Sequence, residues 1–314
     1  MVASLLGSLA VGARHFAATD SIAGGPGDLS DAHPGIGALA GSATLDRELP
    51  AAEHHVVESA SPSRASLAQA FLRSDNLRAF AAAAVMEPQR GGVAYAMYAR
   101  SLCVHQAALL AEHGLSGAAA LPYAAPEDPS AYATRAAAFR AAADACASYS
   151  ESELAPSERR RLDQLAAQGG DIFYSISGRS IRAAQSGDRV ELRELLQAVL
   201  AQRDPLLLII ALPKLVDVAA VDALAADLDV RTQEDRENVV DAALSVLPCR
   251  FGLVCDARSP DVLASCLDQG QCAADRVTLV RDALPADQRV AFDLALLRLE
   301  AAVRDSRPDV LSRP

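Results

Sequence analysis

The sequence predicts an all-α fold, in which antiparallel helices stack side by side in a solenoid-like or irregular array that disulfides hold together. First, the 314 residues are 51% hydrophobic but only 4% aromatic, with no Trp, so Ala, Leu and Val supply the apolar content. Ala and Leu favour helices, whereas strands prefer β-branched and aromatic residues. Second, residues typical of helix starts and helix ends recur along the chain, and no stretch shows the alternation of apolar and polar residues that is typical of a strand. Third, the six cysteines lie where all of them can pair.

Residues 1–18 have the character of a signal peptide. An apolar run extends from Val2 to Ala13, which is too short to span a bilayer but fits the apolar region of such a segment. Only Met1 precedes this run, so the usual basic start is missing, and an ordinary buried helix is the alternative. We expect an exported protein without a stable membrane span.

Residues 19–63 are predicted to form a flexible tether. They consist mainly of Gly, Ala, Ser, Pro and Asp without any period, and such a composition buries too little apolar surface to become ordered. The run Glu53-His54-His55 could bind a metal weakly, but we interpret it as a polar stretch of the tether.

Residues 64–314 are predicted to form a single α-helical domain of about ten to twelve helices. A polar residue before a proline is a typical helix start, and Pro alone can occupy the first helical position. Glycine just after a periodic stretch is a typical helix end. The predicted starts are Asp128-Pro129, Ala155-Pro156, Asp204-Pro205, Ser259-Pro260 and Leu284-Pro285, and the predicted ends are Gly114, Gly169-Gly170, Gly187 and Gly270.

Two of these helices have informative apolar patterns. The stretch DPLLLIIALPKLVDVAA, residues 204–220, is apolar all round, so it should be a central buried helix that is bent or split at Pro213. The last long helix instead has a single apolar face, because its apolar residues repeat at intervals of four, three and four. These residues are Phe292, Leu296, Leu299 and Val303.

Four of the six cysteines lie within residues 249–272. Structural zinc prefers closer pairs, often with His, and a redox site would place two residues between its cysteines. Here five residues separate the members of each pair and no His is near, so disulfides are favoured over metal binding and over free buried thiols. A glycine turn after a helix folds the chain back over its last turn. We therefore expect Cys249–Cys255 and Cys266–Cys272.

The other two cysteines, Cys103 and Cys146, lie on two predicted helices with a Pro- and Gly-rich connection between them. Antiparallel packing of these helices would bring the two sulfurs together. Six pairable cysteines and an apolar run near the start both indicate an oxidising compartment. We expect a periplasmic or secreted protein.

The chain resembles a loose group of uncharacterised exported helical proteins of GC-rich proteobacteria. The resemblance rests on LPCRFGLVCDARSPDVLASCLDQGQC (247–272), GGVAYAMYARSLC (91–103) and RAAADACASYSESEL (140–154), and it extends over roughly residues 66 to 285. It implies the compartment, the cysteine pairing and the helical architecture. It implies no catalytic residue.

No catalytic residue, cofactor or metal ligand is predicted. His105 and His113 would lie about 12 Å apart along a helix, too far to share one ion. The serines of GDIFYSISGRS (170–180) lack the Gly-x-Ser-x-Gly elbow, and no glycines precede Lys214 as in a phosphate loop. The run ERRRLD (158–163) is interpreted as a solvated face balanced by acids, with a docking patch for an acidic partner as the alternative.

The function that these observations favour is binding. A net charge of −11 argues against a nucleic-acid partner. We expect an exported binding or scaffold protein that holds another protein in a groove between helices. The alternatives are a carrier of a small apolar ligand and, third, an enzyme such as a hydrolase. The oligomeric state stays open.

Overall fold

The computed structural model describes residues 66–112, 129–216, 218–226, 228, 230 and 232–312. They all belong to one compact unit, Ala65–Pro314. The predicted signal-like segment (1–18) and tether (19–63) lie outside the described residues, as do His113, Gly114 and Asp128 of the sequence-based predictions.

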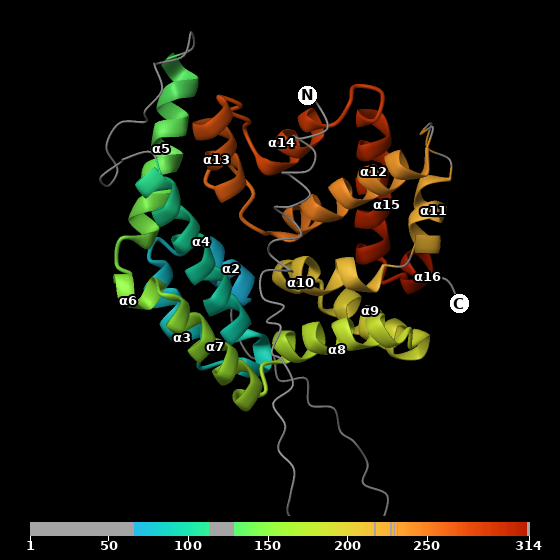
Figure 1. The fold of residues 1–314 in the computed structure, drawn as a ribbon, viewed down its shortest axis with the longest axis horizontal. Helices are drawn as coiled ribbons and strands as arrows, with labels where there is room; N and C mark the ends of the chain where they lie inside the picture. The colour runs from blue at the N-terminus through green and yellow to red at the C-terminus, as the bar shows by residue number, and fades with distance from the viewer. Residues whose placement is uncertain are drawn as a thin grey trace, which may run out of the picture. The chain divides into compact units, whose positions relative to one another are not determined.

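The described residues are helical and contain no strand beyond one isolated bridge between Asp256 and Asp275, so the all-α prediction is confirmed (Figure 1). The helices are α2 (Leu67–Leu72), α3 (Leu77–Ala84), α4 (Gly92–Glu112), α5 (Pro129–Cys146), α6 (Glu151–Leu154), α7 (Pro156–Gly169), α8 (Ile172–Ser186), α9 (Arg189–Gln202), α10 (Pro205–Leu215), α11 (Val218–Ala225), α12 (Gln233–Val246), α13 (Pro260–Gln269), α14 (Arg276–Ala283), α15 (Arg289–Arg304) and α16 (Pro308–Leu311), with the 3₁₀ helices η1 (Pro88–Arg90) and η2 (Leu247–Phe251).

One predicted helix start is wrong, and one predicted break lies slightly later than expected. Leu284-Pro285 does not open a helix: the Gln288 N–H donates to the Pro285 carbonyl at 2.9 Å in a turn, and α15 begins only at Arg289. The apolar stretch 204–220, predicted to be bent or split at Pro213, is divided just beyond that residue: α10 ends at Leu215 and α11 begins at Val218. Pro213 lacks the N–H that would bond to the carbonyl four residues earlier, and α10 ends two residues after it.

The described residues form 15 α-helices, more than the number predicted. The additional ones include α2, α6 and α16, of six, four and four residues. A segment of one turn shows no complete apolar period, so periodicity cannot detect it.

The first helices pack around α4. One face of α4 is buried against α3, and its aromatic side chains join a cluster with α2, α3 and α8. The ring centroids of neighbouring members lie 5.3 to 6.2 Å apart. The members are Phe71, Phe80, Tyr95, Tyr98 and Phe173.

The later helices pack around α10. The side chains of Leu207, Ala211 and Leu212 are fully buried or nearly so, and α10 contacts α8, α9, α12 and η2. The prediction of a central buried helix is therefore confirmed. The apolar face predicted for α15 is buried as well, chiefly against α12. Helix α9 also contacts α15 and α16, so helices distant in sequence meet and the array is irregular.

One carboxylate joins these two groups of helices. Asp171 is fully buried, and its Oδ1 accepts hydrogen bonds from the N–H groups of Phe173 and Tyr174 at 3.1 and 3.0 Å, which caps α8. Its Oδ2 accepts from the N–H groups of Val93 and Ala94 at 2.8 and 3.3 Å, in the first turn of α4. A single side chain thus satisfies four N–H groups that two helix starts leave without intrahelical partners.

The approach of α4 to this carboxylate requires two glycines. Gly91 has a positive φ of 78°, and a Cβ there would overlap the ring of Phe173. A Cβ at Gly92 would overlap the backbone carbonyl of Ala84. Any larger residue at either position would push α3 or α8 away from the start of α4.

The start of α4 also contacts the cap of α10. The Tyr95 hydroxyl donates to both carboxylate oxygens of Asp204 at 3.0 Å, while Oδ1 of Asp204 caps α10 at the N–H groups of Leu206 and Leu207. Burial raises the pKa of Tyr95 and also that of Asp204. The first turn of α4 therefore positions the N-termini of both α8 and α10.

We expect Asp171→Asn to lower the free energy of unfolding by about 2 kcal/mol, because the amide would turn an N–H₂ group toward one of the two helix starts. Asp188→Asn is the matched control: Asp188 caps only α9, at an exposed position, and Asn caps as well as Asp does. Urea unfolding at neutral pH measures both. Equal stability losses in the two variants would contradict the shared cap.

Candidate functional site

The cysteines pair as the sequence predicts. Disulfides join Cys103 to Cys146, Cys249 to Cys255 and Cys266 to Cys272, with Cα atoms 5.3, 5.6 and 4.3 Å apart. All six cysteines are therefore bonded.

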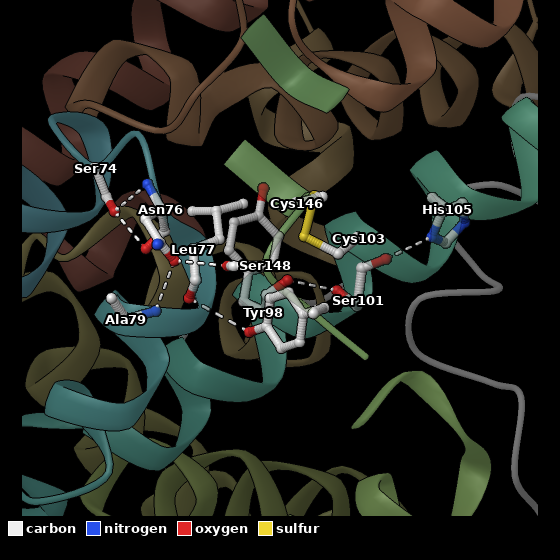
Figure 2. The surroundings of a disulfide bond; sticks show 11 residues. Ser74, Asn76, Leu77, Ala79, Tyr98, Ser101, Cys103, His105, Cys146 and Ser148 are labelled. Carbon is white, nitrogen blue, oxygen red and sulfur yellow. Dashed lines mark hydrogen bonds between the residues drawn. A yellow bond between two sulfur atoms is a disulfide. The ribbon is translucent and has the colours of Figure 1, made fainter. Parts of the chain in front are cut away.

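The Cys103–Cys146 disulfide clamps three helices (Figure 2). It joins the middle of α4 to the last residue of α5. Just beyond it, the Ser148 hydroxyl donates to Oδ1 of Asn76 at 2.8 Å, the same oxygen that caps α3. The Tyr149 hydroxyl donates to the Leu77 carbonyl at 3.3 Å. The disulfide thus fixes the end of α5 against α4, and the two hydrogen bonds fix the residues after it against the start of α3.

The other two disulfides close the short glycine turns that the sequence predicts. Gly252 and Gly270 have φ values of 97° and 68°, in the left-handed region. The Gly270 N–H donates to the Cys266 carbonyl at 3.2 Å as α13 ends, and the Leu253 N–H donates to the Pro248 carbonyl at 3.1 Å. In each case the chain folds back over the last helical turn and brings the second cysteine to the first. Cys255 and Cys266 are buried, so we assign these bonds a structural role.

Of the residues considered for chemistry, Lys214 and one of the serines of 170–180 meet, because Nζ of Lys214 donates to the Ser177 hydroxyl at 3.1 Å. His105 is exposed on α4, and its Nδ1 lies 3.1 Å from the Ser101 carbonyl. Within the residues that the structure describes, no three His, Cys, Asp or Glu side chains form a group that could hold a metal ion. Over the same ranges, no helix is both long and apolar enough to cross a membrane.

The charged run 158–163 forms the balanced face that the sequence predicts. Arg161 pairs with Glu158 at 2.7 Å, and Arg159 pairs with Asp163 at 3.2 Å, both within α7. Exposed pairs of this kind contribute little to stability.

One buried cation escaped the sequence analysis. The guanidinium of Arg100, on α4, donates to the carbonyls of Glu153, Leu154 and Ala155 at 2.9, 2.6 and 2.6 Å. Burial lowers the pKa of Arg100. These three carbonyls lie where α6 ends, so Arg100 anchors the α6–α7 connection to α4.

The exposed surface of α15 has an unusual apolar character. Val290, Leu294 and Leu297 are 65%, 43% and 60% exposed to solvent. Ala301, one turn further along the helix, is exposed as well. Their spacing of four, three and four repeats that of the buried face, so α15 is apolar on two faces. Val290, Leu294, Leu297 and Ala301 are called the α15 stripe below.

A groove continues from one end of the α15 stripe. It has a volume of about 440 Å³, and α11, α15 and α16 line it. Ala301 belongs to both the stripe and the groove. Arg298 closes one wall by donating to the Leu224 carbonyl at 2.6 Å, and Arg307 pairs with Asp309 at 3.1 Å. The stripe and the groove together form the candidate binding surface.

A second cavity, between α5 and α13, is much smaller. It has a volume of about 10 Å³ and is lined by residues that include Arg135, Leu263 and Cys266. That is space for about one water molecule, so it cannot hold an apolar ligand.

No family model, curated protein or solved structure matches this chain. The candidate surface therefore rests on its geometry. The sequence analysis found the buried face of α15 but missed the stripe, although a second apolar set at the same spacing was visible two residues earlier, from Val290. Periodicity alone does not tell which of two apolar faces a neighbouring helix covers.

We expect removal of Cys103–Cys146 to destabilise the protein more than removal of Cys266–Cys272. The sequence separations are 43 and 6 residues, which correspond to about 4 and about 2 kcal/mol in the chain-entropy model. Double Cys→Ala variants of each pair, compared by urea unfolding and far-UV circular dichroism, test this expectation. Non-reducing peptide mapping that linked Cys103 to a cysteine of 249–272 would contradict the pairing itself.

Proposed function

We propose that this chain is an exported protein that binds another protein by taking an amphipathic helix of its partner along the α15 stripe. The exposed row of Val290, Leu294 and Leu297 is the observation that carries the proposal. A soluble protein rarely leaves large apolar side chains in one continuous row unless another molecule covers them.

The spacing of the stripe suits a helical partner. Intervals of four, three and four are those of the apolar seam in a coiled coil, where side chains of one helix fit between those of the other. A partner helix would cross α15 at about 20°. Covering each large side chain of the stripe would contribute on the order of 1–2 kcal/mol, since these side chains are already partly buried.

The groove supports an anchor at one end of this helix. Ala223 and Ala301 are small, so the space between α11 and α15 accepts a bulky apolar side chain of the partner. The borders carry both charge signs, with Glu300 paired to Arg304 and Asp293 paired to Arg281 at 3.0 Å. Because acidic and basic residues both lie beside the stripe, a partner helix with residues of both charges beside its apolar face is favoured.

The three disulfides support the proposed compartment. Structural disulfides persist in oxidising surroundings and are rare in the cytosol. Together with the apolar run of residues 2–13, they favour a periplasmic or secreted protein.

A carrier of a small apolar ligand is the second candidate. The groove volume of about 440 Å³ falls within the range of small-molecule sites, which favours this alternative. However, Arg298, Arg307 and Asp309 line the same groove, so an apolar ligand would lie against charged groups. A protein helix, with its own polar edge, fits this lining better.

We expect Leu294→Ser combined with Leu297→Ser to weaken partner binding at least about a hundredfold, as the loss of a central apolar anchor does, while the far-UV helical signal is retained. Met86→Ser is the matched control, because Met86 is 79% exposed and follows α3, so it is not part of the α15 stripe. A photoreactive phenylalanine analogue at position 297 or at position 86 identifies the partner segment in the native compartment.

The expected crosslink from position 297 is to a segment with apolar residues at heptad spacing, and position 86 should give none. Crosslinks that were equally frequent from both positions would contradict the proposal. Crosslinks between two copies of this chain would do so as well, because they would replace the foreign partner with self-association.

A further inference from the structure

Lys214 stands out from all the other cations of the chain. It is the single lysine among 29 Lys and Arg residues. It lies half-buried in the last turn of α10, where its Nζ donates to the Ser177 hydroxyl at 3.1 Å and to the Ile210 carbonyl at 2.6 Å. Burial lowers the pKa of Lys214.

The partners of this ammonium are neutral. Many arginines of the chain pair with a carboxylate, for example Arg179 with Glu191 and Arg276 with Asp261, at 2.8 and 2.9 Å. Among the described residues, no carboxylate lies within 4 Å of Nζ of Lys214. A partly desolvated charge without a counterion is unfavourable, so an anion from outside the described chain would stabilise it.

Two unused donors meet at this point. An ammonium has three protons, and the contacts with Ser177 and Ile210 use two of them. The Ser177 oxygen accepts from Lys214, and its own proton has no acceptor among the described contacts. One proton of Lys214 and one of Ser177 therefore remain for a ligand. A carboxylate has two oxygens, which match these two donors.

Two exposed apolar side chains flank Ser177 along α8. Tyr174 and Ile181, three residues before and four after Ser177, lie on the same face of α8 and are 37% and 40% exposed. A ligand whose carboxylate meets Lys214 would lay its remaining atoms against these two side chains.

We propose that Lys214 and Ser177, with Tyr174 and Ile181 beside them, form a binding site for a carboxylate carried by an apolar group. Two sources supply this chemistry: a fatty acid, and the C-terminal carboxylate of a peptide with apolar last residues. The site lies between α8 and α10 and uses none of the residues of the α15 stripe, so it goes beyond the proposed function and does not depend on it.

Labelling with [13C,15N]lysine provides a local probe, because the chain has one lysine and hence one Cε signal. We expect decanoate, or N-acetyl-Ala-Leu-Leu with a free C-terminus, to shift this signal at millimolar concentration or below. Binding should also raise the pKa of Lys214, since a nearby negative charge favours the ammonium. Decanamide and the amidated peptide should cause no shift. Binding of decanoate would identify a fatty acid as the ligand, and binding of the free-acid peptide would identify a peptide C-terminus.

Variants distinguish carboxylate binding at this site from a general attraction of anions to exposed cations. Lys214→Met keeps the apolar stem and should weaken binding by about tenfold or more in calorimetry, and Ser177→Ala should weaken it severalfold. Arg182→Met, which removes an exposed cation from the same helix, should leave binding unchanged. Lack of binding by both carboxylates would overturn the proposal. Binding that Lys214→Met and Ser177→Ala leave intact, or that Arg182→Met weakens equally, would overturn it too.

Discussion

The buried carboxylate of Asp171 is the contact on which the arrangement of the helices depends. Each of its oxygens caps one helix, α4 or α8, and α8 in turn packs on α10, around which the later helices are arranged. Helix starts carry N–H groups without intrahelical partners, and burying them without an acceptor costs about 1–3 kcal/mol each. Because one side chain serves both starts, α4 and α8 cannot separate without exposing all four donors, which belong to Val93, Ala94, Phe173 and Tyr174.

The geometry of the Lys214–Ser177 site, and less directly that of the α15 stripe, depends on this contact between α4 and α8. Ser177 lies on α8 shortly after Asp171, and Lys214 lies on α10, whose cap Tyr95 contacts from α4. The spacing between these two donors therefore follows from how α4 positions the starts of α8 and α10. The α15 stripe is more remote, but α15 packs on α12, and α12 packs on α10. The disulfides reinforce this frame locally, with Cys103–Cys146 closing α3, α4 and α5 together.

Features fixed by neighbouring residues could be predicted from the sequence. The caps at Asp204 and Gly270 and the short disulfides follow from a few adjacent positions, because a left-handed glycine turn determines where the next residues go. The shared cap could not be predicted, since Asp171 and the N–H of Val93 are 78 residues apart and meet only through helix packing. The pair of Lys214 and Ser177 was missed for the same reason, at a separation of 37 residues. The one local sign was Gly91-Gly92, a glycine pair that opens a helix where glycine usually ends one.

Amide hydrogen exchange at Val93 and Phe173 tests the shared cap most directly. First-turn N–H groups normally exchange fast, because no helical carbonyl holds them. If Asp171 binds both helix starts in a buried site, the two amides should be protected as strongly as those inside α10. The amide of Val190, which bonds to the exposed carboxylate of Asp188, provides the internal comparison and should exchange much faster. Exchange of Val93 and Phe173 at the rate of Val190 would contradict the account.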